Sequence, residues 1–429
     1  MPDAAADHHE VPDIHDVIDR RAISSVFQPL VDLASGQVLG YEALSRGPAG
    51  TPWESPAVLF AAARAAGRDS ELDWVCRAAA YRAALDAGLE QTLFVNMEPT
   101  AWGTPCPDDL APVVALAQRR LRVVTEMTER AIAADPSGLL TATASCRSAG
   151  WGVALDDVGA EPMSLALMPF VHPDVVKLDM HLLHAPDHPH TAHVVAAVAA
   201  YAEASGATVL AEGIETAAHE SIARTMGATV GQGWRYGRPG ALPVVPEPVG
   251  DLLPLVRPPA TDRTSATPFE IVSAHRPAVV TTKAALMPMS RHLEALARDS
   301  HQPPVLLACF QEARHFSAAT ARRFSAIAQR SPLVAALGMD LSDEPAPGVR
   351  GAHFAAGDAL RGEWNVLLVG PHQAAALVAR DLGDRGPEAE RRFVFATTYD
   401  RALVVAAARS LLHWLAPSGP QTIPDLLAI

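Results

Sequence analysis

The stretch from Phe27 to Gly47 reads FQPLVDLASGQVLGYEALSRG, and it decides the fold of the first part of the chain. Two apolar runs, 25–31, which begins just before this stretch, and 37–43 within it, have the composition of β-strands. The residues between them, Asp32 to Gly36, are typical of a tight turn. This spacing predicts an antiparallel hairpin whose second strand places the carboxylate of Glu42 at its end.

Six later strand-like runs also end on polar side chains. They carry Asn96 in FVNM, Glu126 in VVTEMTE, Asp156 and Asp157 in VALDD, Lys177 and Asp179 in VVKLD, Glu212 in VLAEGIE and Gln232 in TVGQG. The runs alternate with amphipathic, alanine-rich helix patterns, which predicts an α/β fold with a parallel sheet. Polar groups repeated at strand ends are what a parallel barrel presents on its catalytic face. With a strand count near eight, we expect a closed barrel of modified TIM type that begins with a hairpin.

Carboxylates and one amide at that face are the ligands that hard divalent cations prefer. Glu42, Asn96, Glu126 and Asp156 would share one such ion. In a regular strand Asp157 would point away from Asp156, but at a strand end both can face a pair of ions. Two ions about 3.5–4 Å apart clamp a phosphate and lower the pKa of a bridging water.

Other residues would assist this chemistry. Lys177 would orient the attacking hydroxide or offset charge on the phosphate. Glu212 would take a proton or complete the second metal site. Glu129 and Asp179 would support Glu126 and Lys177 from behind. The chain has few lysines, so the one at position 177 indicates a need for a compact ammonium rather than a planar guanidinium.

The bulk composition limits the other possibilities. A length of 429 residues indicates two domains, and a net charge of −14 argues against nucleic-acid binding. The acidic start, MPDAAADHHE, is no signal peptide, and no apolar run reaches the ~18 residues of a membrane-spanning helix. No lysine lies in a Walker-type motif, which excludes a P-loop nucleotide site. We expect a cytoplasmic protein that contacts no membrane, with free cysteines.

The chain is expected to divide at a proline-rich segment, since residues 239–268 carry eight prolines. The predicted parts are a disordered lead-in at 1–12, a barrel at 13–242, a linker at 243–268, a smaller α/β domain at 269–418 and a tail at 419–429. In the smaller domain we expect strands at 270–274, 304–309, 349–354, 364–369 and 392–397, and helices at 286–298, 315–329, 371–382 and 399–414.

The stretch 27–47 resembles the opening of the EAL-domain family, the cyclic di-GMP phosphodiesterases. The resemblance continues through FVNM, TEMTE, ALDDVG, VVKLD, AEGIE and GQGWRYGRP, over residues 15–240. It implies a modified barrel that binds two Mg²⁺ or Mn²⁺ ions and hydrolyses cyclic di-GMP to linear pGpG.

The resemblance also implies a role for each matching position. Metal ligands would be Glu42, Asn96, Glu126, Asp156 and Asp157. The catalytic groups beside them would be Lys177, near the attacking water, and Glu212, a ligand or general base supported by Glu215. Substrate contacts would be Gln28 and Arg46, with Gln232 near the catalytic water.

The loop after Asp157 departs from the family pattern. The family commonly reads FGTGYSSL there, whereas residues 158–165 read VGAEPMSL, with Glu161 and Pro162 replacing a glycine and a tyrosine. This loop normally couples substrate, second metal and dimer contacts, so its change bears on turnover and on a homodimer through the barrel. Because no predicted metal ligand is replaced, an active enzyme is favoured. A cyclic di-GMP receptor without turnover and a scaffold for protein contacts remain as alternatives.

The smaller domain resembles the DICT family, a sensory module found with diguanylate cyclases and two-component proteins. The matching stretches are MSRHLEALA, CFQEARHFSAATARRF, WNVLLVGPHQAAALVARDL and FVFATTYDRALVVAAARSLL. This pairing implies that an unknown signal received by the smaller domain regulates the barrel.

Overall fold

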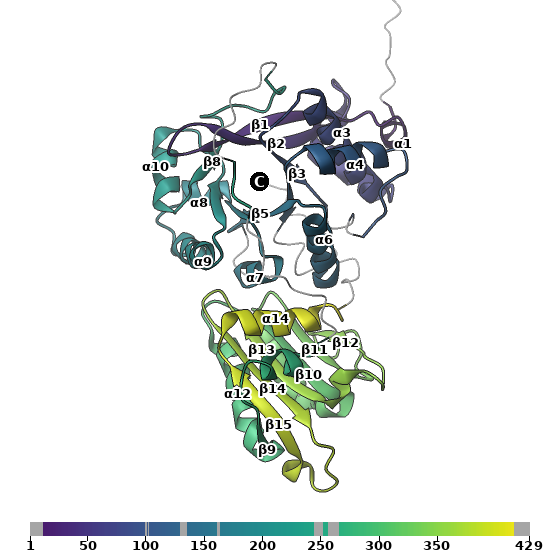
Figure 1. Cartoon of the computed structure of the whole chain (residues 1–429), viewed down its shortest axis with the longest axis vertical. Coiled ribbons are helices and arrows are strands. Elements are labelled where there is room, and N and C mark those ends of the chain that lie inside the picture. Colours follow the sequence, from purple (N-terminus) through teal and green to yellow (C-terminus); the bar gives the residue numbers. More distant parts are fainter. Residues whose placement is uncertain are drawn as a thin grey trace, which may run out of the picture. The chain divides into compact units, whose positions relative to one another are not determined.

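The computed structural model describes residues 12–98, 101, 103–128, 135–160, 164–243, 252–255 and 266–415. Several predicted features lie outside these residues: Glu129, Glu161, Pro162, most of the lead-in and linker, and the tail. The described strands form two sheets, a closed barrel and a seven-stranded sheet (Figure 1).

The barrel contains eight strands joined in chain order. They are β1 (Ser24–Asp32), β2 (Val38–Arg46), β3 (Thr92–Asn96), β4 (Val123–Thr128), β5 (Gly152–Val158), β6 (Val175–Leu178), β7 (Thr208–Ala211) and β8 (Val230–Gln232). Strand β1 is antiparallel to both of its neighbours, β2 and β8. The pairs β2–β3, β3–β4 and β7–β8 are parallel. The predicted hairpin and the predicted modified TIM-type barrel are therefore confirmed.

Helices separate most of the barrel strands along the chain. They are α1 (Ile14–Asp19), α2 (Pro56–Ala65), α3 (Asp69–Asp86), α4 (Ala111–Arg120), α6 (Pro136–Ser148), α7 (Met168–Val171), α8 (Met180–His184), α9 (Pro189–Ser205) and α10 (Ala217–Thr225). Their ends follow local rules. Helix α9 has Pro189 in its first turn and is capped at its C-terminus by Gly206, whose φ of 78° is left-handed. Thr216 caps the N-terminus of helix α10, where its hydroxyl accepts a hydrogen bond from the His219 backbone amide.

The second sheet has the strand order β12-β11-β10-β13-β14-β15-β9. Its strands are β9 (Val279–Thr282), β10 (Val305–Glu312), β11 (Val334–Met339), β12 (Arg350–Ala352), β13 (Glu363–Val369), β14 (Ala374–Asp381) and β15 (Arg392–Thr398). Its helices are α11 (Pro268–Ser273), α12 (Lys283–Asp299), α13 (Ala318–Ala328) and α14 (Arg401–Leu412). Alternate residues of β10, such as Leu306 and Ala308, share one apolar cluster with Leu293 of α12 and Phe324 of α13. The predicted second α/β domain is confirmed.

Two elements of this domain were predicted wrongly. The segment 371–382 is predicted to be a helix, yet most of it forms β14 between β13 and β15. Pairing on both sides and burial of its apolar run override the helix propensity of alanine. The segment 270–274 was expected to be a strand but lies at the end of helix α11 and just beyond it. Thr267 and Glu270 form a capping box there, and Pro268 occupies the first turn.

Candidate active site

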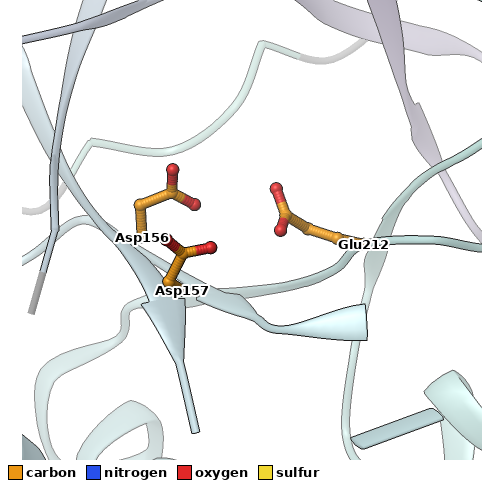
Figure 2. A group of neighbouring side chains, drawn as sticks. All are labelled: Asp156, Asp157 and Glu212. Atoms are coloured by element: carbon orange, nitrogen blue, oxygen red, sulfur yellow. The ribbon is translucent and has the colours of Figure 1, made fainter. Parts of the chain in front are cut away.

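Three carboxylates meet near the ends of β5 and β7. Asp156 and Asp157 lie near the C-terminal end of strand β5, and Glu212 directly follows strand β7. Each offers an oxygen within 4.8 Å of the other two (Figure 2). Asp157 has a φ of 57°, in the left-handed region that residues other than glycine rarely adopt. This backbone turn lets two consecutive strand residues face the same site.

Lys177 lies beside this group. Its side chain is 1% exposed, and Nζ is 2.8 Å from Oδ1 of Asp156. A buried ammonium is unfavourable unless it is paired, and this contact provides the opposite charge. Lys177 therefore offsets part of the negative charge that Asp156, Asp157 and Glu212 bring together.

A second group forms around Glu42, which is buried. Asn96 donates from Nδ2 to Glu42 Oε1 at 3.2 Å, and Gln232 donates from Nε2 to Glu42 Oε2 at 2.6 Å. The same Gln232 nitrogen is 3.1 Å from Oε1 of Gln28, whose own amide donates to the carbonyl of Gly237. Oε1 of Gln232 is buried and accepts no hydrogen bond from any residue in the described part of the chain. Two amides therefore hold the Glu42 carboxylate in place.

Glu126 belongs to the same side of the barrel as Asn96. The two residues are register partners in neighbouring strands β3 and β4, and Glu126 is 1% exposed. Strand pairing and hydrogen bonds thus join Glu42, Asn96 and Glu126 in one group from β2 to β4. The other predicted ligands, Asp156 and Asp157, lie with Glu212 in the group from β5 and β7.

Three further residues that were predicted to bind substrate or to support the site lie in the described part of the chain. Arg46 ends β2 and donates to the Ser45 carbonyl at 2.8 Å. Asp179 caps helix α8, where its carboxylate accepts from the His181 backbone at 2.7 Å and lies 2.6 Å from the His181 ring. Glu215 is exposed near the start of α10. Their roles in substrate binding or support remain predictions, and Glu129 lies outside the described residues.

A buried ion pair behind Asn96 was not predicted. Arg77 Nη2 lies 2.6 Å from Asp73 Oδ2, and both side chains are at most 5% exposed. Asp73 Oδ1 accepts from the backbone amide of Glu98 at 2.8 Å, which fixes the chain just after Asn96. These residues line a cavity of about 300 Å³ that also reaches Asn96. Asp73 and Arg77 are four residues apart, a spacing that is usual for an exposed ion pair on one helix. Only the apolar residues around them in α3 could have indicated that this ion pair is buried.

Glu98 also lines this cavity. Burial raises the pKa of the Glu98 carboxyl, and the nearby Asp73 charge raises it further, against the opposing effect of Arg64.

Among the described residues, no helix is both long enough and apolar enough to cross a membrane.

Comparison with known proteins connects these observations. The model of the EAL domain matches residues 13–239, and the model of DICT, a sensory domain in diguanylate cyclases and two-component systems, matches residues 270–382. The probable cyclic di-GMP phosphodiesterase PdeB of Escherichia coli (strain K12) is 30% identical over 246 residues, which are 55% of this chain and 45% of that protein. The cyclic di-GMP phosphodiesterase RocR of Pseudomonas aeruginosa is 24% identical over 249 residues, covering 54% and 61%.

Among solved structures, the Klebsiella pneumoniae BlrP1 calcium/cy-diGMP complex is similar at 29% identity and a TM-score of 0.46. The match covers 51% of this chain and 56% of that one. The chain therefore spans less than two thirds of the length of PdeB, RocR and BlrP1. The EAL match itself covers more than half of the present chain. The chain belongs to the EAL domain family and carries a DICT domain after its barrel.

Proposed function

We propose that the barrel is a metal-dependent phosphodiesterase that hydrolyses cyclic di-GMP to linear pGpG. One observation carries the proposal: Asp156, Asp157 and Glu212 approach within 4.8 Å at the end of the barrel strands, with Lys177 beside them. Three carboxylates this close repel one another, and one ammonium offsets only part of their charge. Such an oxygen-rich group is suited to hard divalent cations.

The side chains fit Mg²⁺ or Mn²⁺, and two ions are part of the proposal. The ligands would be Glu42, Asn96, Glu126, Asp156 and Asp157. Asn96 uses its Nδ2 to hold Glu42, which leaves its carbonyl oxygen as the donor to a cation. When bound, the ions would neutralise phosphate charge and make a water molecule more acidic.

The chain's own side chains would bind the dinucleotide, orient the attacking water and accept its proton. Gln28, Arg46 and Gln232 would contact the dinucleotide, and the buried Oε1 of Gln232 would accept a hydrogen bond from the water or the substrate. Lys177 would orient the water for attack on phosphorus in line with the ribose 3′ oxygen, which leaves. Glu212 would take the proton of that water. Asp179 and Glu215 would keep Lys177 and Glu212 in place, and the same is proposed for Glu129.

The direct test incubates the purified chain with cyclic di-GMP and Mn²⁺ and follows pGpG by chromatography. We expect pGpG to form, its formation to stop with excess EDTA, and activity to return when Mn²⁺ or Mg²⁺ is added beyond the chelator. Comparison of the two ions at equal concentration would identify the preferred one. Formation of pGpG at an undiminished rate in EDTA would contradict the metal-dependent proposal.

A receptor without turnover is the second candidate, because residues 158–165 depart from the family sequence. Binding of cyclic di-GMP in calorimetry, without pGpG after prolonged incubation with either ion, would favour the receptor. Absence of binding would exclude both candidates and leave the scaffold.

We also propose that the DICT domain regulates hydrolysis, and that the barrel is cytoplasmic and can form a homodimer. Deleting residues 260–429 is expected to change the hydrolysis rate or the dimerisation constant, because a regulatory domain biases the barrel between states of different activity. Steady-state kinetics and analytical ultracentrifugation would measure the two quantities. A truncated chain that folds and matches the full chain in both would contradict regulation.

A further inference from the structure

A cavity of about 300 Å³ opens within the DICT domain, apart from the residues of the proposed hydrolysis. Its lining comes from helices α12 and α13, the end of β10 with the segment that follows it, and the first part of β13. All of these residues belong to the described part of the chain. The volume lies at the lower end of the range for small-molecule sites, which suits a ligand with one ring.

One wall of the cavity is aromatic and rigid. Phe310 and Trp364 line it, and each is mostly buried. Phe310 packs edge to face with Phe316 and Phe324, at centroid distances of 5.1 and 5.5 Å. Such interlocked rings have few alternative rotamers, so this wall presents a fixed apolar surface to a flat group.

The cavity also carries cationic side chains, three of which are already paired with carboxylates. These are Lys283 with Glu388, Arg314 with Glu312 at 2.8 Å, and Arg323 with Glu294 at 2.6 Å. The fourth, Arg291 of α12, has no carboxylate partner among the residues that the structure describes. The site therefore has one guanidinium whose charge is not offset within the domain.

Gln311, near the end of strand β10, has an unusual backbone conformation beside the cavity. It has a φ of 63°, is 6% exposed and lines the cavity. An extra residue enters β10 here, because Cys309 pairs with Leu337 while Glu312 pairs with Met339. A bulge redirects side chains, and a strained buried residue persists where the surroundings hold it. The His315 ring supports this turn by donating from Nδ1 to the Phe310 carbonyl at 2.9 Å.

We propose that this cavity binds a small organic anion, a carboxylate or phosphate attached to a single flat ring. The ring lies against Phe310 and Trp364, and the anionic group pairs with Arg291, whose planar guanidinium matches either oxyanion. Gln311 Nε2 donates one hydrogen to Asp381 Oδ2 at 3.4 Å, and its second amide hydrogen adds a directional polar contact to the anion. This binding is independent of the proposed hydrolysis, so either proposal can fail without the other.

Calorimetry on the full chain tests the ligand chemistry, with phenyl phosphate, benzoate and the neutral analogue benzyl alcohol as probes. EDTA is present throughout, so that metal ions in the barrel cannot hold the anions. We expect one binding site per chain for at least one of the two anions, and binding at least about tenfold weaker for benzyl alcohol. The anion that binds more tightly identifies carboxylate or phosphate as the preferred group. Equal affinity for the neutral probe, or no binding of either anion at millimolar concentration, would overturn the proposal.

Arg291→Gln tests the location, with Arg322→Gln as the matched control. Both arginines are exposed, so neither variant should change the melting temperature, and each removes one positive charge from the DICT domain. Arg322 lies in α13 but does not line the cavity. We expect Arg291→Gln to weaken binding of the anion about tenfold or more and Arg322→Gln to leave it unchanged. Equal binding by the two variants would place the anion elsewhere and refute the site.

Discussion

Replacing Asp156 by alanine is expected to abolish hydrolysis of cyclic di-GMP, with kcat at least about 1000-fold lower, or about 4 kcal/mol of transition-state stabilisation. Asp156 contacts both the neighbouring carboxylates and the lysine of the site. Its carboxylate lies within 4.8 Å of oxygens of Asp157 and Glu212 and 2.8 Å from Nζ of Lys177. Its loss would therefore remove a metal ligand and disturb the lysine together.

The measurement is pGpG formation at saturating Mn²⁺, together with Mn²⁺ affinity by calorimetry and thermal melting to establish that the variant is folded. The matched control is Asp187→Ala, because Asp187 is an exposed acid between α8 and α9. The control should keep full activity and Mn²⁺ affinity. If folded Asp156→Ala hydrolysed the dinucleotide at the rate of the unmodified chain, the assigned metal site would be wrong.

The predictable part of the site follows from the barrel's regularity. Strand ends of a parallel barrel meet at one face, so a polar residue after each apolar run could be assigned to that face from the sequence. Asn96 and Glu126 illustrate this, since strand pairing alone makes them neighbours. The hydrogen bonds from Asn96 and Gln232 to Glu42 could not be derived, because they depend on side-chain rotamers and on residues far apart in the sequence.

Other features were predicted wrongly or missed because they depend on contacts with distant parts of the chain. The segment that becomes β14 has the local composition of a helix, and its strand conformation depends on partners contributed by β13 and β15. The burial of Asp73 with Arg77 likewise depends on what packs against α3. The error at α11 is of another kind, because the capping box of Thr267 and Glu270 is a local signal that the sequence itself contains.

Replacing Lys177 by methionine is expected to lower kcat about 100- to 1000-fold while leaving KM within a few fold. The ammonium is buried beside Asp156, and its proposed role is to orient the attacking water, so its loss should affect the transition state more than binding of the dinucleotide. Lys177→Arg should not restore activity, because a wider planar guanidinium does not fit a fully buried position shaped for an ammonium. An exposed barrel cation, Arg120, provides the control Arg120→Met.

The same substitution separates the electrostatic role of Lys177 from its catalytic role. Without the ammonium, Asp156 loses its partner at 2.8 Å beside two further carboxylates, so the metal-free variant should unfold more easily, by about 3–5 kcal/mol. Mn²⁺ would replace part of the missing positive charge and should therefore raise the melting temperature of Lys177→Met more than that of the unmodified chain. Activity would stay low, because a cation that balances charge does not orient the water. A variant that kept its kcat in Mn²⁺ would show that Lys177 only balances the charge of the acids.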